Sequence, residues 1–283
     1  MTKTRAQILI LLLFSFMQVS HHPPAATFND LNRLGLEGKV KSIMEFTYTV
    51  PGKTEDAELR KVVSQKLILF DETGFIKETR LYSNSAEFLI SEFMRENEGK
   101  LLQMNEYLAD GSLNLSINYS YDDKGFRSEA IYNWSENRVI GEICERFDYY
   151  DDILQNELFT RIKYKNEYRG YCTEEIFYTE DGRISFKITT KYDFRGNRLE
   201  SAYLDGNGRL SWITKYKYDR YDHLTESNVY KSNRIAVESA YKYKFDDTGN
   251  WVSRAEDRTV YVNILTAGIE KSDMLTERVI DYY

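Results

Sequence analysis

The chain of 283 residues has only three His, two Cys and three Pro, and these scarcities exclude several kinds of protein. His21 and His22 adjoin the N-terminal apolar segment, so His223 stands alone in the rest of the chain. A single His lacks the second ligand that a metal site needs and the partner that acid–base catalysis needs. The spacings His-Glu-x-x-His, Gly-x-Ser-x-Gly and Cys-x-x-Cys are absent, as is a phosphate-binding loop. We therefore expect no enzyme activity, no catalytic residue, no metal and no cofactor, and we interpret His223 as a turn residue.

The first 26 residues have the pattern of a secretory signal peptide and its exit segment. Lys3 and Arg5 precede an unbroken apolar run from Ile8 to Phe14, and the residues from Ser20 to Ala26 are small, polar or Pro. An uncleaved anchor is the alternative, but the apolar run is short for a span of about 20 residues. We expect the protein to be exported, to the periplasm, the outer envelope or the medium, and to contact the membrane only through the cleaved signal.

The remaining residues, 27–283, are predicted to form a single domain. No Pro-rich, Gly/Ser-rich or low-complexity linker follows Asp30. The formal net charge is −7, and an acidic chain repels phosphate backbones, so nucleic acid is not an expected partner. The sequence leaves the oligomeric state open.

A repeated motif gives the fold class: an aromatic residue, Asp, two variable residues, then Gly or Asp. It occurs six times, as FDETGFIKE (70–78), YDDKGFRSE (121–129), FDYYDDILQ (147–155), YDFRGNRLE (192–200), YDRYDHLTE (218–226) and FDDTGNWVS (245–253). Repetition of this kind is typical of repeat architectures. A second turn, such as the one in YTEDGRI (178–184), lies between successive motifs, and Asp-Gly steps suit tight hairpins. Where Asp151 and Asp222 replace the Gly, Asp still tolerates the left-handed conformation.

Between turns the residues alternate with period two, which predicts antiparallel strands with one buried and one wet face. Leu113, Leu115 and Ile117 are predicted to share the buried face, with Asn114 and Ser116 on the wet face. We predict an all-β fold, an antiparallel up-and-down meander of about sixteen strands. Open sheets seldom exceed about ten strands without curling. We therefore expect a long curled or superhelical sheet, or a sheet folded over on itself.

Cys144 and Cys172 are predicted to remain unbridged, although export permits disulfides. Folding the meander at turns near residues 151 and 167 places the two Cys two strands apart. That separation, at about 4.8 Å per strand, exceeds what a disulfide spans. Mass spectrometry of the non-reduced protein tests this prediction, and a crosslink between the two Cys would contradict it.

Two kinds of side chain are candidates for binding. Acidic turns, such as Asp122 with Asp123, Asp246 with Asp247 and Asp205 with Asn207, gather oxygens, but none has the ligand spacing of a calcium loop, so we interpret them as turn caps. The 23 Tyr, 15 Phe and three Trp are candidates for stacking on sugars or peptides. By parity, however, Trp134 and Trp212 lie on the face assigned to the core, which favours cross-strand packing.

The stretches YTEDGRISFKITTKYDFRGNRLE (178–200) and YLDGNGRLSWITKYKYDRYDHL (203–224) resemble RHS or YD repeats. The opening LEGKVKSIMEFTY (36–48) and the stretches FDDTGNWVSR (245–254) and TERVIDYY (276–283) resemble small secreted YD-repeat proteins of the Bacteroidota type. The resemblance covers nearly the whole mature chain and implies β-strand architecture. It implies no established reaction, and no toxin-like domain follows the repeats.

The sequence thus favours a non-catalytic exported repeat protein that binds a protein or a glycan on the cell envelope, through an extended sheet surface. The first alternative is a carboxylate-dependent glycan-active enzyme, which needs two acids about 5–9.5 Å apart in a cleft. The second is an outer-membrane β-barrel, which the charge of Asp281, in register with Val279 and Tyr283, disfavours. The binding residues and the identity of the ligand stay unknown from the sequence.

Overall fold

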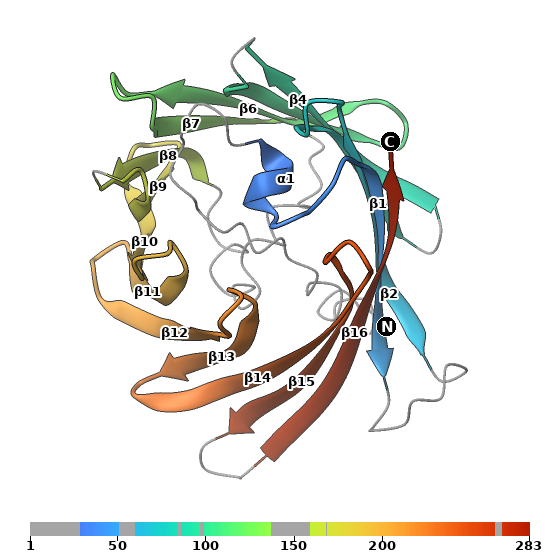
Figure 1. The fold of residues 1–283 in the computed structure, drawn as a ribbon. Coiled ribbons are helices and arrows are strands. Elements are labelled where there is room, and N and C mark those ends of the chain that lie inside the picture. The colour runs from blue at the N-terminus through green and yellow to red at the C-terminus, as the bar shows by residue number, and fades with distance from the viewer. Residues whose placement is uncertain are drawn as a thin grey trace, which may run out of the picture.

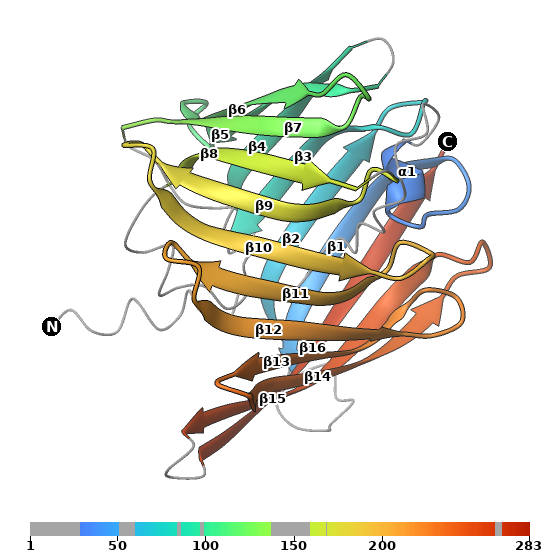
Figure 2. The same cartoon turned by 90° about the vertical axis from the view of Figure 1, so that its left-hand side faces the viewer.

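The computed structural model describes residues 29–50, 60–83, 86–96, 99–136, 159–167, 169–263 and 268–283. These residues form one short helix and sixteen strands, which close into an antiparallel barrel. Figure 1 looks along the barrel, and Figure 2 shows the strands running obliquely around it. The predicted signal peptide, Cys144, Asp151 and the motif at 147–155 lie outside the described residues.

The elements, in chain order, are α1 (Asp30–Arg33), β1 (Val40–Val50), β2 (Lys61–Phe70), β3 (Ile76–Ser83), β4 (Ala86–Arg95), β5 (Leu101–Leu108), β6 (Leu113–Tyr121), β7 (Arg127–Trp134), β8 (Phe159–Asn166), β9 (Cys172–Thr179), β10 (Ile184–Tyr192), β11 (Arg198–Asp205), β12 (Leu210–Tyr218), β13 (Leu224–Lys231), β14 (Arg234–Phe245), β15 (Trp251–Asn263) and β16 (Gly268–Tyr282).

The all-β meander and the number of strands are confirmed, but the predicted curled or superhelical sheet is wrong, because the sheet closes. Each strand pairs with its neighbours in the chain, and β1 then pairs with β16, with Glu45 opposite Arg278 and Thr47 opposite Thr276. This last pairing joins residues more than 200 positions apart, whereas the repeat pattern reports only hairpins between adjacent strands. Because the repeat pattern contains only local information, it predicted the meander but not the pairing of the first strand with the last.

The repeated motif forms one kind of turn. In YDFRGN the Asp193 N–H donates to the Asn197 carbonyl (2.9 Å), and the Gly196 N–H donates back to the Asp193 carbonyl (3.2 Å). The Asp193 carboxylate accepts from the backbone N–H groups of Arg195 (2.8 Å) and Asn197 (2.9 Å). The motif Asp is therefore the cap of its own hairpin, as the sequence indicates. The strands on both sides pair antiparallel, with a one-residue bulge between Lys191 and Tyr192.

The fourth position of the turn is left-handed. Gly196 has φ +94°, and a Cβ there would lie 2.7 Å from the Tyr171 hydroxyl. At the same position Asp222 has φ +67°, which confirms that Asp replaces Gly in this conformation. Asp222 is held by Asn197, whose side-chain amide donates to its carboxylate (2.7 Å), so one turn contacts the next.

The inner face of the barrel is identified by α1, which lies within the ring in Figure 1. Leu31 of α1 belongs to a buried cluster with Ile43 and Ile68, so these residues point inward. Phe93 packs against this cluster and also against a second, larger cluster that includes Ile117 on β6. The inner face therefore carries the hydrophobic core, and the residues that alternate with the core residues point outward.

The start of β6 departs from the predicted alternation. Leu113, predicted to be buried, is 45% exposed, whereas Asn114, predicted to be wet, is fully buried and donates to the Glu106 carboxylate. The physical reason is a one-residue bulge in β6: the consecutive β5 residues Glu106 and Tyr107 pair with Leu115 and Leu113, so Asn114 is the extra residue and Leu113 moves to the outer face.

The seam between β1 and β16 is held at one end by chain segments from both termini. The Asn250 side chain accepts from the Glu37 N–H (2.7 Å) and donates to the Glu37 carbonyl (2.9 Å). The same amide donates to the Tyr282 hydroxyl (2.8 Å), and the Tyr283 N–H donates to the Lys39 carbonyl (2.9 Å). We call this group of contacts the seam clasp. It lies at the end of the barrel where the aromatic-Asp turns and α1 lie (Figure 2).

Candidate functional site

The inner wall near the seam is polar. Glu45 on β1 and Arg278 on β16 form an ion pair (Nε–Oε1 3.2 Å) in which each side chain is 2% exposed. The Arg278 guanidinium lies over the Trp251 ring, 3.3 Å from its centroid. Burial lowers the pKa of Arg278, and the Glu45 carboxylate opposes that shift. Arg254 and Glu256 are buried on the same wall, so charged groups gather along β15, β16 and β1.

The opposite part of the inner wall is aromatic. Phe177 and Phe186 stack with their centroids 4.0 Å apart, and Phe159 meets Phe177 edge-on at 5.1 Å. Trp212 stacks on Tyr203 at 5.0 Å and is buried. These rings cover one another, as the parity of Trp212 predicted, and act as core.

A cavity of about 360 Å³ opens between the β2–β3 turn and the end of β4. We call it the rim pocket. Its walls include Phe75 and Phe93, with the charged residues Lys77, Arg95 and Glu96 around them. It lies at the end of the barrel that carries the aromatic-Asp turns.

Arg95 is fixed in the rim pocket by α1. Its Nη2 donates to Asp30 Oδ2 (2.6 Å), its Nη1 donates to the Gly99 carbonyl (3.1 Å), and its guanidinium lies 4.9 Å from the Phe75 centroid. Asp30 is itself oriented by the Ile76 N–H, which donates to the same oxygen (2.8 Å). Burial lowers the pKa of Arg95, and the charge of Asp30 counters this effect.

Two polar atoms of the rim pocket have no hydrogen-bond partner among the described residues. Arg95 Nε is a buried donor, and Glu96 Oε1 is a buried acceptor. Glu96 Oε1 forms an ion pair with Lys100 Nζ at 3.4 Å. Both atoms have less than 1 Å² of accessible surface, so they lie beneath the wall of the pocket and do not face its interior.

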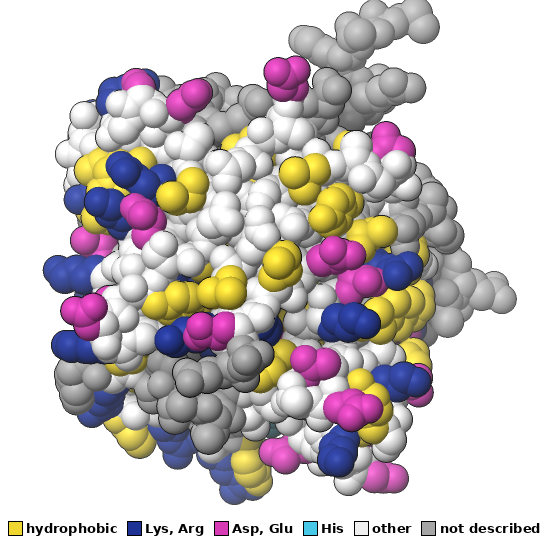
Figure 3. Space-filling view, turned by 90° about the horizontal axis from the view of Figure 1, so that it is seen from above, with side chains coloured by type: hydrophobic (Ala, Val, Ile, Leu, Met, Phe, Trp, Pro, Cys, Tyr) yellow, Lys and Arg dark blue, Asp and Glu magenta, His cyan; other side chains and the backbone are white. Residues whose placement is uncertain are grey.

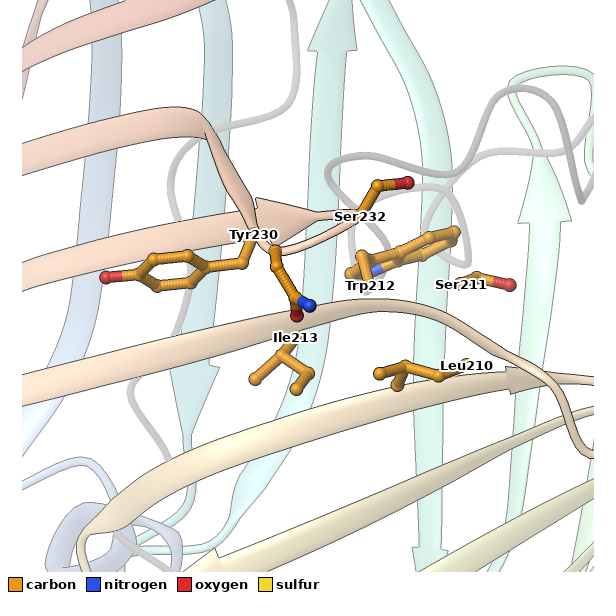
Figure 4. Close-up of a pocket in the computed structure, with 7 residues that line it drawn as sticks. Leu210, Ser211, Trp212, Ile213, Tyr230 and Ser232 are labelled. Atoms are coloured by element: carbon orange, nitrogen blue, oxygen red, sulfur yellow. The ribbon is translucent and has the colours of Figure 1, made fainter.

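A smaller cavity, of about 210 Å³, lies at the other end of the barrel (Figure 4). Its walls are Trp212, Leu210, Ile213 and Tyr230, with the polar groups of Ser211, Ser232 and Asn233. It forms where the pairing of β12 with β13 stops at Ile213 and Tyr230, so the strands separate beyond that pair. It contains no charged side chain.

His223 occupies the turn position predicted for it. Its N–H donates to Asp219 Oδ1 (3.0 Å), its ring Nδ1 lies 3.1 Å from Asp219 Oδ2, and its ring packs against Phe245, with centroids 4.7 Å apart. Burial alone would raise the pKa of Asp219, but the hydrogen bonds from His223 lower it below its usual range. The contacts of this pair among the described residues are those of a turn cap.

The acidic turn residues act as caps. Asp122 accepts from the N–H groups of Lys124 and Phe126, Asp246 from those of Thr248 and Asn250, and Asp205 from those of Asn207 and Arg209. No group of three or more His, Cys, Asp or Glu side chains suited to a metal ion occurs among the described residues. Within the same ranges, no helix is long and apolar enough to cross a membrane.

Cys172 forms no disulfide with a described residue, and burial raises its pKa to about 12. Because Cys144 lies outside the described residues, the absence of a bridge stays a prediction. Sequence reasoning missed Arg95 and Asp30, which lie 65 positions apart and meet only because α1 caps the barrel end. It also missed Glu45 and Arg278, whose contact depends on closure. Charged residues on the buried parity of a strand were the available signal for Arg95, Glu45 and Arg278, but Asp30 lies on α1 and has no such signal.

The outer wall carries charge along much of the barrel. Ile188 points inward, so Lys191, three residues later, points outward, where it pairs with Glu200 (2.8 Å) on β11. Lys217 pairs in the same way with Glu226 (2.6 Å) on β13. The wall over the strands at the top of Figure 1 shows hydrophobic side chains in separate groups among charged and polar ones (Figure 3).

Outward apolar side chains gather nearer the seam. Met44 on β1 lies opposite Val279 on β16, and Val279 is 63% exposed. Phe46 and Tyr48 follow on the same outer side of β1, with ring centroids 6.4 Å apart. Glu277, which pairs with Arg60 (3.1 Å), interrupts this region, so the apolar surface is not continuous.

No family model matches the chain, and no curated protein matches it. Among solved structures, the chain is similar to a porin-like protein from Bacteroides uniformis ATCC 8492, with a TM-score of 0.51 and 11% identity over 86% of this chain and 98% of that one. A porin-like protein from Bacteroides vulgatus ATCC 8482 matches with a TM-score of 0.31 and 12% identity, over 84% and 97% of the two chains. A structure of TcdB2-TccC3-TEV matches with a TM-score of 0.29 and 11% identity, over 76% of this chain and 14% of that chain. The first similarity shows the fold, a closed barrel of the kind seen in a porin-like protein.

Proposed function

We propose that the chain is a non-catalytic β-barrel protein of the cell envelope, which binds a protein or glycan and whose charged outer wall faces water. The closed barrel and its similarity to a porin-like protein favour a barrel over the open exported sheet expected from the sequence. Of the interpretations drawn from the sequence, the outer-membrane β-barrel is therefore better supported than the exported repeat protein. The remaining choice is whether the barrel crosses the outer membrane.

The observation that carries the water-facing proposal is the row of ion pairs on the outer wall. Lys191 is 75% exposed and Lys217 is 67% exposed, and each forms a cross-strand pair with a Glu on the next strand. A Lys that faces lipid costs about 2–4 kcal/mol at the bilayer midplane and about 0–1 kcal/mol near the interface. Lys191 and Lys217 stand one residue from the ends of β10 and β12, but Lys187 and Lys215, which share their outward parity, lie near the middle of these strands. Lipid-facing walls are apolar over a band about 25 Å tall, and this wall has Lys and Glu within its strands. Such a wall suits water.

An outer-membrane pore is the second candidate. An even number of strands, antiparallel order, full closure and the likeness to a porin-like protein favour it. The outward apolar region at Met44, Phe46 and Val279 also favours a pore. The polar inner wall at Glu45 and Arg278 favours it as well. In this case the charged pairs of β10 to β13 would face lipid, which is the physical argument against it.

Cell fractionation and a detergent test separate the two candidates. We expect the full chain to leave the cytoplasm, to be released from the envelope without detergent and to give no conductance in a planar bilayer. A variant that lacks residues 1–26 is the matched control and should stay in the cytoplasm, because the signal is removed. Extraction only by detergent, together with single-channel conductance, would overturn the water-facing proposal and support the pore.

A further inference from the structure

We propose that a row of exposed aromatic side chains at one end of the barrel binds a neutral glycan chain. This inference rests on the proposed binding function and gives it a place and a ligand class. Among the described residues the exposed aromatic side chains are Phe88, near the far end of the barrel, and five others at the end that carries α1. These five, which we call the aromatic row, are Phe194, Tyr221, Phe245, Tyr282 and Tyr283.

The aromatic row follows the edge of the barrel over neighbouring hairpins. Phe194 lies in the β10–β11 turn, Tyr221 in the β12–β13 turn and Phe245 at the end of β14, and Tyr282 and Tyr283 end the chain at β16. Two strand spacings of about 4.8 Å separate each turn from the next, so neighbouring turns lie about 10 Å apart. The row is therefore long and narrow.

The first two turns of the row are joined to each other. Arg195 Nη1 donates to the Arg220 carbonyl (3.0 Å) and to the Asp222 carboxylate (3.1 Å), and the Asn197 amide donates to the same carboxylate oxygen (2.7 Å). These contacts fix the spacing between the two turns. A ligand that spans both turns then loses less affinity to the ordering of the protein.

The rest of the row is also held in place. The His223 ring lies between Tyr221 and Phe245, with centroid distances of 6.1 and 4.7 Å. The Tyr282 hydroxyl donates to the Asp246 carboxylate (2.7 Å), which joins β16 to the β14–β15 turn. The aromatic row is thus a connected surface and not a set of separate side chains.

The two outermost rings of the row are open to a ligand. Phe194 is 79% exposed. Arg220 covers one face of the Tyr221 ring, 4.5 Å from its centroid, and Tyr221 is still 62% exposed, so the rest of this ring is accessible. Apolar surface of this kind on a water-facing edge marks a binding site, and an aromatic ring packs well against the carbon face of a sugar.

The charges beside the row favour a neutral ligand that has hydroxyl groups. Arg195 and Asp222 form an ion pair whose side chains are 44% and 39% exposed, so the pair offers donors and an acceptor to sugar hydroxyls. Because the two charges cancel, the pair creates no excess of positive charge. A site for an anionic polymer would need such an excess.

The shape of the row favours a glycan chain over a protein partner. A stable protein interface takes about 20–30 residues from each side, whereas the aromatic row is a single file of five side chains. A glycan chain presents the same kind of ring at regular intervals, and two linked sugar rings cover the distance between neighbouring turns. The regular placement of the rings thus suits a repeating polymer.

The test uses the purified full-length mature protein and calorimetric titration with maltohexaose, cellohexaose, mannohexaose and chitohexaose. We expect at least one to bind with a Kd of about 1 mM or tighter, and about tenfold more tightly than the methyl glycoside of its own sugar, because a chain contacts several rings. Phe194→Ala and Tyr221→Ala should each weaken binding about five- to tenfold, and Tyr221→Phe, which keeps the ring, should retain most of it. Phe88→Ala is the matched control and should leave binding unchanged, because Phe88 is an exposed ring outside the row.

Three results would overturn the inference: no binding of any hexasaccharide, binding no tighter than that of the methyl glycoside, or binding that both Ala variants leave unchanged while circular dichroism shows them folded. Two further measurements would assign the row to another partner and also overturn it. One is self-association that Phe194→Ala abolishes, and the other is binding to phosphatidylcholine vesicles that Tyr221→Ala abolishes.

These outcomes are distinct from those of fractionation. A barrel released without detergent that binds no hexasaccharide keeps its proposed location and loses only this site. A detergent-extracted barrel can still be titrated in micelles.

Discussion

Asn250 is expected to stabilise the end of the barrel seam through the seam clasp. It is 1% exposed, and its amide makes hydrogen bonds of 2.7, 2.9 and 2.8 Å to Glu37 N–H, the Glu37 carbonyl and the Tyr282 hydroxyl. Asn250→Ala removes all three. Each hydrogen bond contributes about 0.5–1.5 kcal/mol net, and Glu37 is exposed enough for water to replace part of the loss. We therefore expect the free energy of unfolding to fall by about 2–3 kcal/mol.

Thermal unfolding followed by tryptophan fluorescence measures this effect. For a chain of this size, 1 kcal/mol corresponds to about 2–4 °C, so the melting temperature should fall by about 4–12 °C. Asn207→Ala is the matched control, because Asn207 is exposed and lies in a similar turn away from the seam. It should change the free energy of unfolding by less than about 0.5 kcal/mol. If both variants have the same melting temperature as the unchanged protein, the seam clasp does not stabilise the closed barrel, and the argument from its hydrogen bonds is refuted.

Four further predictions concern other parts of the barrel. Arg278→Leu leaves Glu45 buried without its ion-pair partner and should destabilise the protein by about 3–5 kcal/mol, measured by urea unfolding. The double variant Glu45→Leu/Arg278→Leu should recover most of that loss, and equal losses in the two variants would contradict this prediction. Ser232 has φ +51° in the β13–β14 turn, so Ser232→Gly should stabilise the folded protein by about 0.5–1 kcal/mol. Ser211→Gly, in the strand β12, should destabilise it by a similar amount, and thermal unfolding measures both effects. Because burial raises the pKa of Cys172 to about 12, a Cys144→Ser variant should react with Ellman's reagent at pH 8 only after denaturation, and rapid labelling of the folded protein would argue against the burial. Hydrogen bonds from Thr179 and Arg183 lower the pKa of Asp181 to about 2, and turn hydrogen bonds also lower the pKa of Asp205. A carboxylate whose pKa is lower in the folded state stabilises the folded protein at pH values above its unfolded pKa, and this stabilisation is lost as the pH falls through the folded pKa. The melting temperature should therefore stay constant down to about pH 4 and fall between there and pH 2, and the fall should be smaller in Asp181→Asn.

The sequence predicted those features of the barrel that depend on neighbouring residues. The turn made by Asp193 and Gly196 is such a feature, because every group in it lies within five positions of the chain. The inward orientation of Trp212 follows equally from strand parity. Asp222 in the left-handed position was predicted for the same local reason.

The features that the sequence did not predict depend on distant residues. Closure pairs β1 with β16, and no local pattern distinguishes these strands from the others. Asn114 and Leu113 exchanged faces because Asn114 is an extra, bulged residue of β6 relative to its partner strand β5, and alternation alone does not show a bulge. The rim pocket needs α1 against β4, a contact between Asp30 and Arg95 that hydrophobic periodicity does not show. The rim pocket therefore could not be predicted from the sequence, whereas the capping of its β2–β3 turn by Asp could.

The single pairing that closes the ring also has a consequence for the order of folding. All other strand pairs join neighbours in the chain, and most of these hairpins bring together residues a short loop apart and form quickly, although residues 135–158 separate β7 from β8. The pairing of Glu45 with Arg278 instead spans 233 positions, and its loop-closure entropy is offset only after most of the sheet is in place. Until then β1 and β16 present unpaired backbone edges, which pair readily with other chains. Refolding at high protein concentration should therefore lose protein to aggregation at this last step. The contacts at the seam end this risk, because they pair the exposed edges of β1 and β16 with each other.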